Sequence, residues 1–147
     1  MDIEKLLKSL NAHNVRFILI GAAAFPVYGY TRATVDVDLF IAADEENARN
    51  ARQALLDFGF DLADVSLSDL QQKKLLIRQY ALDVDIHPFA KGVEFEEVWE
   101  RRVIGTIGAQ PANFASLDDL IKMKRAAGRK KDIEDLKELR RIKKTST

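Results

Sequence analysis

Two aspartates stand two residues apart in an apolar stretch, Val35-Asp-Val-Asp-Leu-Phe-Ile41, whose composition is typical of a β-strand. Alternate side chains of a strand point to the same face, so the carboxylates of Asp36 and Asp38 are expected to lie side by side. Two such carboxylates repel each other unless a cation lies between them, and hard oxygen ligands suit Mg²⁺ or Mn²⁺. The alternative interpretation is an edge strand whose solvent-facing side carries both aspartates.

The residues before this strand have the character of an anion site. The apolar stretch Phe17-Ile-Leu-Ile20 ends at Gly21, small residues follow, and Gly29 and Arg32 precede the acidic strand. A glycine between a strand and a helix lets backbone N–H groups approach an anion, and the helix N-terminus adds partial positive charge. The region around Gly21 is therefore predicted to receive a phosphate group next to a metal ion.

A second acidic pair, Asp83-Val-Asp85, repeats the pattern at the end of a later apolar stretch. Two-metal phosphoryl transfer needs a third carboxylate in addition to Asp36 and Asp38. Asp83 and Asp85 share one face of their strand by the same alternation, so spacing alone does not choose between them. His87 follows this pair and could be a further ligand or a proton acceptor, but we expect it to be a strand-end residue hydrogen-bonded to the backbone, and we leave it out of the predicted site.

Together these residues resemble the signature of nucleotidyltransferases with a DNA polymerase beta-like fold. The resemblance rests on Gly21-Ala22, Gly29, Arg32, Thr34 and the Asp36-x-Asp38 pair, and it is nearest to the small prokaryotic branch, with its minimal and toxin–antitoxin-type members. It implies that Asp36, Asp38 and Asp85 are the catalytic and metal-binding carboxylates, with Asp83 as the alternative third ligand. It also implies nucleotide binding by Gly21, Ala22, Arg32 and Thr34. Ala22 departs from the family's usual glycine or serine and can offer only its backbone N–H.

Residues 119–136 resemble the same branch, which has a helix with a lysine, a Gly-Arg turn and a second helix opened by aspartate. Lys124 lies four residues after Leu120 and three after Ile121, so its side chain is expected to leave the core-facing side of its helix. A lysine in that position needs a counter-anion. The resemblance implies that Lys124 contacts the nucleotide phosphates or supports the acidic cluster; a snorkelling surface lysine is the alternative.

Several helices and strands are expected to position these residues. The apolar spacing, caps and turn residues predict a helix from Asp2 to about Asn11, strands over 15–20 and 35–42, a short helix over 22–28, a helix between the N-cap Asp44 and Gly59, and a strand region over 75–86. Farther along they predict a short helix around Phe95 and Trp99, a brief strand or hairpin over 103–107, a loop over 110–115, a helix opened at Ser116, and a last helix N-capped by Asp132. This order predicts an α/β (α+β) fold: a nucleotidyltransferase-like mixed sheet, helices packed on one side, and a C-terminal helical pair.

The chain has 147 residues and no cysteine, which fits a single domain over 1–147 and excludes disulfides and thiolate metal sites. Lys and Arg balance Asp and Glu overall, but residues 122–147 carry about seven excess positive charges and residues 1–121 as many excess negative ones. The basic segment is interpreted as a solvated helical face, or else as a surface facing triphosphate or nucleic acid. Neither a signal peptide nor a membrane-spanning stretch is recognisable, so we expect a cytoplasmic protein with no membrane partner.

The resemblance predicts transfer of a nucleoside monophosphate from an NTP to a hydroxyl acceptor on tRNA, a protein or a small molecule, with Mg²⁺ or Mn²⁺ as cofactor. Two other functions stay open. One is a weakly active or inactive member that binds a cognate toxin or antitoxin partner. The other is a metal-dependent nuclease, which also needs clustered carboxylates.

Overall fold

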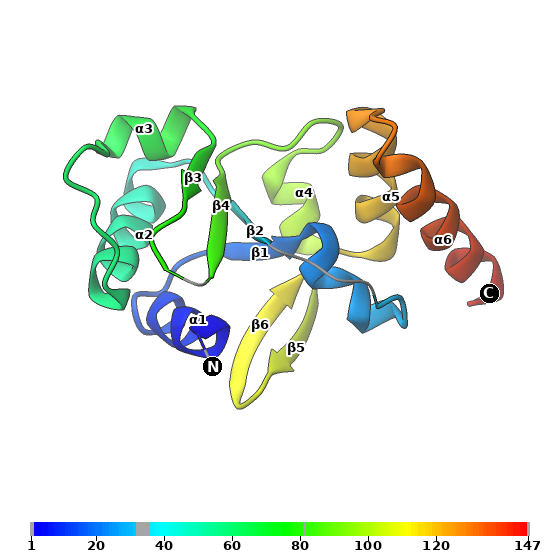
Figure 1. The fold of residues 1–147 in the computed structure, drawn as a ribbon, viewed down its shortest axis with the longest axis horizontal. Coiled ribbons are helices and arrows are strands. Elements are labelled where there is room, and N and C mark those ends of the chain that lie inside the picture. Colours follow the sequence, from blue (N-terminus) through cyan, green and yellow to red (C-terminus); the bar gives the residue numbers. More distant parts are fainter. Residues whose placement is uncertain (1, 32–35, 81, 147) are drawn as a thin grey trace.

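The structure is a computed structural model that describes residues 2–31, 36–80 and 82–146. The described elements, in chain order, are α1 (Asp2–Ala12), β1 (Phe17–Ile20), the 3₁₀ helix η1 (Gly21–Tyr28), β2 (Asp36–Ile41), α2 (Glu45–Phe58), α3 (Leu67–Gln72), β3 (Leu75–Ile77), β4 (Asp83–His87), α4 (Phe95–Glu100), β5 (Val103–Ile107), β6 (Gln110–Phe114), α5 (Leu117–Ala127) and α6 (Asp132–Thr145). The mixed α/β class and the C-terminal helical pair were both predicted, and both are confirmed (Figure 1).

The six strands form one mixed sheet in the order β3-β4-β2-β1-β6-β5. β1 and β2 pair antiparallel, whereas β2 and β4 pair parallel through the connection that contains α2, α3 and β3. A parallel pair needs such a long crossover because the chain must return to the same end of the sheet. The two acidic strands β2 and β4 are therefore neighbours near the middle of the sheet.

Apolar residues alternate with the acidic ones along both strands and form the core beneath them. Val37 and Leu39 of β2 and Val84 and Ile86 of β4 are at most 5% exposed. α1 packs against α2 and β6, and α2 packs against α3. Figure 1 shows α2 and α3 at one end of the molecule and the α5–α6 pair at the other.

The caps predicted for α2 are confirmed. The side chain of Asp44 accepts a hydrogen bond from the backbone N–H of Asn47, which satisfies one of the unpaired donors at the helix start. Gly59 ends the helix at a φ of +118°, a conformation that glycine adopts without a Cβ clash. These caps fix where the crossover from β2 towards β4 changes direction.

Three expectations are wrong in detail. Residues 75–86 do not form one strand but two antiparallel strands, β3 and β4, with Leu76 opposite Asp85. Residues 110–115 are not a loop, because 110–114 form β6, which pairs with both β1 and β5. Asp132 is not the N-cap of the last helix but its first residue, and Lys131 holds the cap position.

Within the described ranges 2–31, 36–80 and 82–146, no helix is both long enough and apolar enough to cross a membrane.

Candidate active site

The parallel register of β2 and β4 gathers four carboxylates. Asp36 pairs with Asp83 and Asp38 pairs with Asp85, and paired residues of adjacent strands point to the same face. The side chain of Asp85 is 6% exposed, while that of Asp83 is 25% exposed. Asp85 also lines the pocket beside the sheet, together with Asp36 and Asp38. Both observations favour Asp85 over Asp83 as the third carboxylate.

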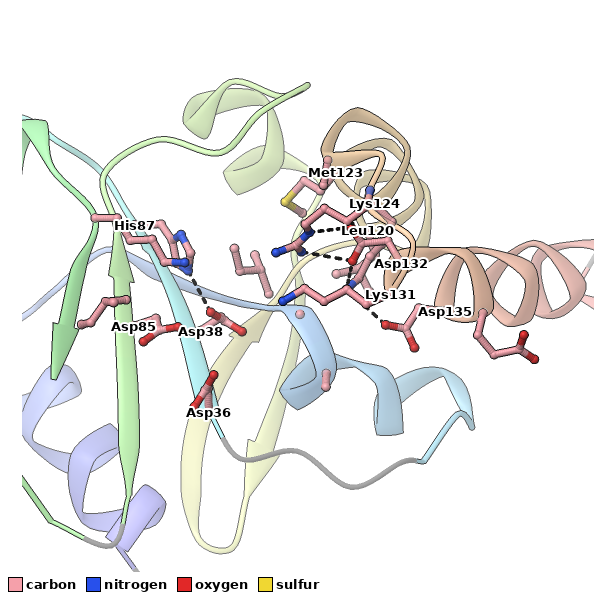
Figure 2. A pocket seen from close by; sticks show the side chains of 18 of the residues that line it. Asp36, Asp38, Asp85, His87, Leu120, Met123, Lys124, Lys131, Asp132 and Asp135 are labelled. Carbon is pink, nitrogen blue, oxygen red and sulfur yellow. Dashed lines mark hydrogen bonds and ion pairs between the residues drawn. The ribbon is translucent and has the colours of Figure 1, made fainter. Parts of the chain in front are cut away.

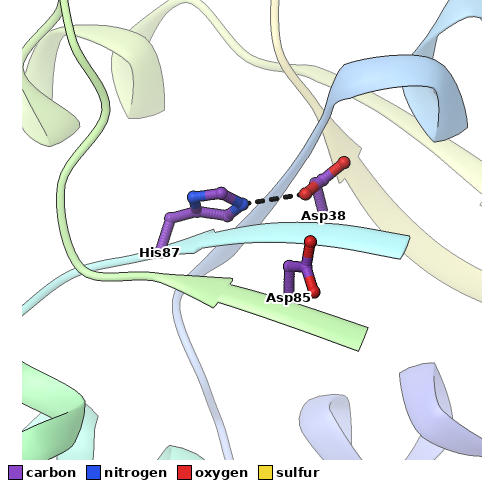
Figure 3. A group of neighbouring side chains, drawn as sticks. All are labelled: Asp38, Asp85 and His87. Carbon is purple, nitrogen blue, oxygen red and sulfur yellow. Dashed lines mark hydrogen bonds and ion pairs between the residues drawn. The ribbon is translucent and has the colours of Figure 1, made fainter. Parts of the chain in front are cut away.

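His87 is bonded to this cluster, contrary to our expectation of a backbone partner. Its Nε2 atom lies 2.8 Å from Oδ1 of Asp38. Figure 3 marks this contact with a dashed line. Ligand atoms of Asp38, Asp85 and His87 all lie within 4.8 Å of one another. The sequence did contain the signal: His87 is two residues after Asp85, so the alternation that aligns Asp83 with Asp85 also places His87 on the same face.

Arg78 is a residue of this cluster that the sequence reasoning missed. Its Nη1 donates to Oδ1 of Asp85 at 2.8 Å, and its other nitrogens lie 3.9 Å from Asp36 and 3.8 Å from Asp83. The hydrogen bond to Asp85 raises the pKa of the Arg78 guanidinium above its usual value. Arg78 follows the end of β3, and the antiparallel pairing of β3 with β4 brings it alongside the acidic residues. In this structure it provides positive charge to three of the four carboxylates.

Gly21 lies directly against the acidic cluster. It begins η1 with a φ of +66°, and a Cβ atom at this position would lie 2.6 Å from Oδ2 of Asp38. Any other residue would be strained in its backbone and would displace that carboxylate. Gly21 and Ala22 both line the pocket with the acids, as the anion-site prediction requires. Arg32 and Thr34 lie outside the described residues.

The opposite side of the pocket is formed by α5, α6 and the turn between them. Nζ of Lys124 lies 3.2 Å from Asp132 and 3.2 Å from Asp135, whose side chains are each 3% exposed. The counter-anion that Lys124 was expected to need is therefore this pair of buried carboxylates on α6. Asp135 also accepts a hydrogen bond from the hydroxyl of Tyr30, which ties η1 and its following turn to α6.

Arg129 completes the charge network at the start of α6. Its Nε donates to Oδ2 of Asp132 at 2.7 Å, and its Nη2 donates to Oδ1. Burial alone would raise the pKa of Asp132, but the hydrogen bonds from Arg129 and Lys124 outweigh it and lower that pKa to about 2. The Asp132 carboxylate is thus held ionised and fixes both cations beside the pocket.

The pocket between the sheet and the helical pair has a volume of about 710 Å³. Asp36, Asp38 and Asp85 line it from β2 and β4, and Lys124, Arg129 and Lys131 line it from the other side. Figure 2 shows the labelled acidic residues of the strands on one side and, on the other, Lys124 of α5 and Lys131 just before α6, with Asp132 and Asp135 of α6 next to them. Of the eight predicted site residues, the six that are described all line this one pocket: Gly21, Ala22, Asp36, Asp38, Asp85 and Lys124.

The donor set fits a divalent metal ion. Carboxylate oxygens suit Mg²⁺ and Mn²⁺, and an imidazole nitrogen is a further good ligand for transition metals. The group with the tightest mutual distances is Asp38, Asp85 and His87. Asp36 extends the acidic surface from the same face of β2.

A family model described as "Nucleotidyltransferase of unknown function (DUF6036)" matches the chain over residues 1–147. A search of curated proteins finds no match to the chain.

Proposed function

The chain belongs to this family of nucleotidyltransferases of unknown function, and from that premise we propose that it transfers a nucleoside monophosphate from an NTP to a hydroxyl acceptor. An oxygen of the acceptor forms a bond to the α-phosphorus of the NTP. The bond from that phosphorus to the oxygen bridging towards the β-phosphorus breaks, and pyrophosphate leaves with the electron pair. The proton of the acceptor hydroxyl passes to the Asp85 carboxylate.

One observation carries this proposal: a single pocket brings the carboxylates of Asp36, Asp38 and Asp85 on the sheet to face three cations, Lys124, Arg129 and Lys131, which lie among the carboxylates of the helical pair. A nucleoside triphosphate bound with divalent metal needs both surfaces, since its metal is held by carboxylates and its phosphate oxygens by cations. The volume of about 710 Å³ lies within the range of pockets that hold small ligands.

Asp36, Asp38 and Asp85 would hold the divalent ion or ion pair, Mg²⁺ or Mn²⁺. When bound, the metal would neutralise triphosphate charge and ease deprotonation of the acceptor hydroxyl. Asp85 is the most buried of the three carboxylates, and this burial suits the assignment of the acceptor side to it. Asp36 and Asp38 lie on the strand next to Gly21, so we assign the triphosphate side to them.

The phosphate-binding role is proposed for Gly21, Ala22 and Lys124, with Arg32 and Thr34 added from the family resemblance. Close packing of Gly21 on Asp38 would bring a phosphate near the metal-binding carboxylate. Lys124 is 13% exposed and paired with Asp132 and Asp135, so it would act as a fixed positive charge at the pocket wall. Fixed charges of this kind lower the barrier because they need no reorganisation during the reaction.

The test is a labelling experiment. The protein is incubated with each of the four α-³²P-labelled NTPs, with Mg²⁺ or Mn²⁺, and with cell extract separated into RNA, protein and small-molecule fractions. The proposal predicts label on one acceptor fraction and release of pyrophosphate in equal amount. The same NTP labelled at the γ-phosphate should leave no label on the acceptor.

The rival functions give different results in the same experiment. A metal-dependent nuclease would shorten nucleic acid without consuming NTP. A protein that only binds a toxin or antitoxin partner would transfer no label under any metal or nucleotide. Either outcome would overturn the proposed activity, and the fraction that takes the label would identify the acceptor.

A further inference from the structure

The three closest potential metal ligands in the described part of the site are not the three predicted aspartates. They are Asp38, Asp85 and His87, whose ligand atoms lie within 4.8 Å of one another. Asp38 is directly opposite Asp85 across the β2–β4 pair, and His87 is two residues beyond Asp85 on the same face. The backbone register alone therefore brings an imidazole to the same point as the two carboxylates, as Figure 3 shows.

His87 is placed as a ligand rather than as a surface residue. Its side chain is 17% exposed, it lines the pocket, and its Nε2 atom is directed at the Asp38 carboxylate. The other oxygen of Asp38 lies 2.6 Å from where a Cβ atom at Gly21 would be, so the glycine is what permits Asp38 this position beside His87. An ion entering between Asp38 and Asp85 would meet the imidazole nitrogen without a large rearrangement of the backbone.

An imidazole changes which metal the site prefers. Mg²⁺ binds oxygen ligands and keeps much of its water, whereas imidazole suits transition metals, whose affinity for nitrogen ligands follows the order Mn²⁺, Fe²⁺, Co²⁺ upward. Mn²⁺ accepts carboxylate ligands as Mg²⁺ does, and as a transition metal it also takes an imidazole nitrogen, which Mg²⁺ takes poorly. A site of two carboxylates and one imidazole thus differs chemically from a site of three carboxylates.

We propose that His87 is a metal ligand together with Asp38 and Asp85, and that the site consequently selects Mn²⁺ over Mg²⁺. The proposal rests on the proposed function for the assignment of the two carboxylates, and it adds the nitrogen ligand and the metal preference. Asp36 then completes the acidic surface next to this ligand group.

The chain offers a matched control for His87. Its second histidine, His13, is also paired with an aspartate, Asp57, but this pair joins α1 to α2 on the surface. His87→Gln and His13→Gln therefore each remove one His–Asp pair, and only the first removes the proposed ligand. Thermal unfolding and circular dichroism of both variants show whether they are folded before metal is added.

The decisive measurement is metal binding without nucleotide. We expect the parent protein and His13→Gln to bind Mn²⁺ about tenfold more tightly than Mg²⁺, or better, by isothermal titration calorimetry. His87→Gln should bind Mn²⁺ about tenfold more weakly than the parent protein does, and its Mg²⁺ affinity should stay within about twofold of the parent value. An unchanged ratio of the two affinities in His87→Gln, or a parent that prefers Mg²⁺, would overturn the proposal.

A spectroscopic measurement on the parent protein tests the same ligand, and its result does not depend on whether the His87 variant folds. Electron spin echo modulation of bound Mn²⁺ should show coupling to one ¹⁴N nucleus, and ¹⁵N-labelling of histidine alone should convert it to ¹⁵N coupling. Absence of nitrogen coupling would contradict ligation by His87. NMP transfer without nitrogen coupling would disprove the ligand and leave the activity standing, whereas nitrogen coupling without NTP consumption would disprove the activity and leave the ligand standing.

Discussion

Gly21 packs against Asp38 so closely that a Cβ atom at Gly21 would lie 2.6 Å from the Oδ2 atom of that aspartate. This contact joins the two halves of the proposed site, the phosphate-receiving turn and the metal-binding strand. It follows from the antiparallel register of β1 and β2, in which Ile20, the residue before Gly21, is opposite Asp38. The glycine is required here both for its positive φ and for the space that it leaves.

Gly21→Ala is therefore expected to lower both stability and metal affinity. The strained φ and the clash together should cost about 2 kcal/mol or more in the free energy of unfolding, measured in urea. Gly29→Ala is the matched control, because Gly29 has a φ of +84° and no atom within 4 Å of the added Cβ. Gly29→Ala should lower the free energy of unfolding by about 1 kcal/mol, which is the cost of a Cβ atom at a positive φ. Its metal affinity should be that of the parent protein. Equal effects of both changes on metal binding would mean that Gly21 does not position Asp38.

Lys124→Met is expected to destabilise the α5–α6 pair strongly. It leaves Asp132 and Asp135, both 3% exposed at the side chain, with a missing counter-charge, and such a loss typically costs about 3 to 5 kcal/mol. Lys122→Met, an exposed lysine on the same helix, should change stability by less than about 0.5 kcal/mol. Adding Asp135→Asn to Lys124→Met should restore part of the lost free energy of unfolding, as measured by urea denaturation. No recovery would indicate that Lys124 acts through packing rather than charge.

Acid should weaken the fold through Asp132. Its folded-state pKa of about 2 is below the unfolded value of 3.8, so its stabilising contribution is present above about pH 4 and is lost as the pH falls through 2. The contribution amounts to about 2 kcal/mol. Asp132→Asn should thus be less stable than the parent at pH 6, and the difference should shrink between pH 4 and pH 2. A difference that stays constant over this range would contradict the assigned ionisation.

Arg78→Gln is expected to tighten binding of divalent metal. Arg78 provides positive charge to Asp85, Asp36 and Asp83, which is the role that a metal ion would take over. The Arg78 side chain is 42% exposed, so water screens part of its charge, and we expect the variant to stay folded without metal. Lys74→Gln is the control, since Lys74 also lines the pocket. Weaker Mn²⁺ binding in Arg78→Gln than in Lys74→Gln would show that Arg78 supports the metal ligands instead of competing with metal.

The alternation of side chains along a strand was enough to predict which aspartates share a face. It placed Asp36 and Asp38 on one face of their strand, and Asp83 and Asp85 on one face of theirs, but it contains no information on how the two strands pair. The parallel register that sets Asp38 opposite Asp85 depends on the crossover through α2 and α3, which is a tertiary feature. His87 was left out of the predicted site because a histidine at a strand end usually bonds to the backbone, although the alternation puts it on the same face as Asp85.

Arg78 and β6 were missed for a different reason. Treating 75–86 as one strand placed Arg78 in its middle, whereas a chain reversal brings it beside Asp85. The segment 110–115 contains Pro111 and Asn113, residues with low strand propensity, so a loop was the natural expectation. Pairing with β1 at Leu19 and with all of β5 overrides that propensity.

The central claim is that the carboxylates of β2 and β4 drive metal-dependent NMP transfer, and Asp36→Ala tests it most directly. The variant removes one carboxylate from a repelling group on an exposed part of β2, so its fold should be intact or slightly stabilised. Transfer of α-³²P-NTP label should fall by roughly a hundredfold or more. Asp64→Ala, at an exposed aspartate outside the pocket, should label the acceptor like the parent. Labelling by Asp36→Ala at the rate of the parent would contradict the account.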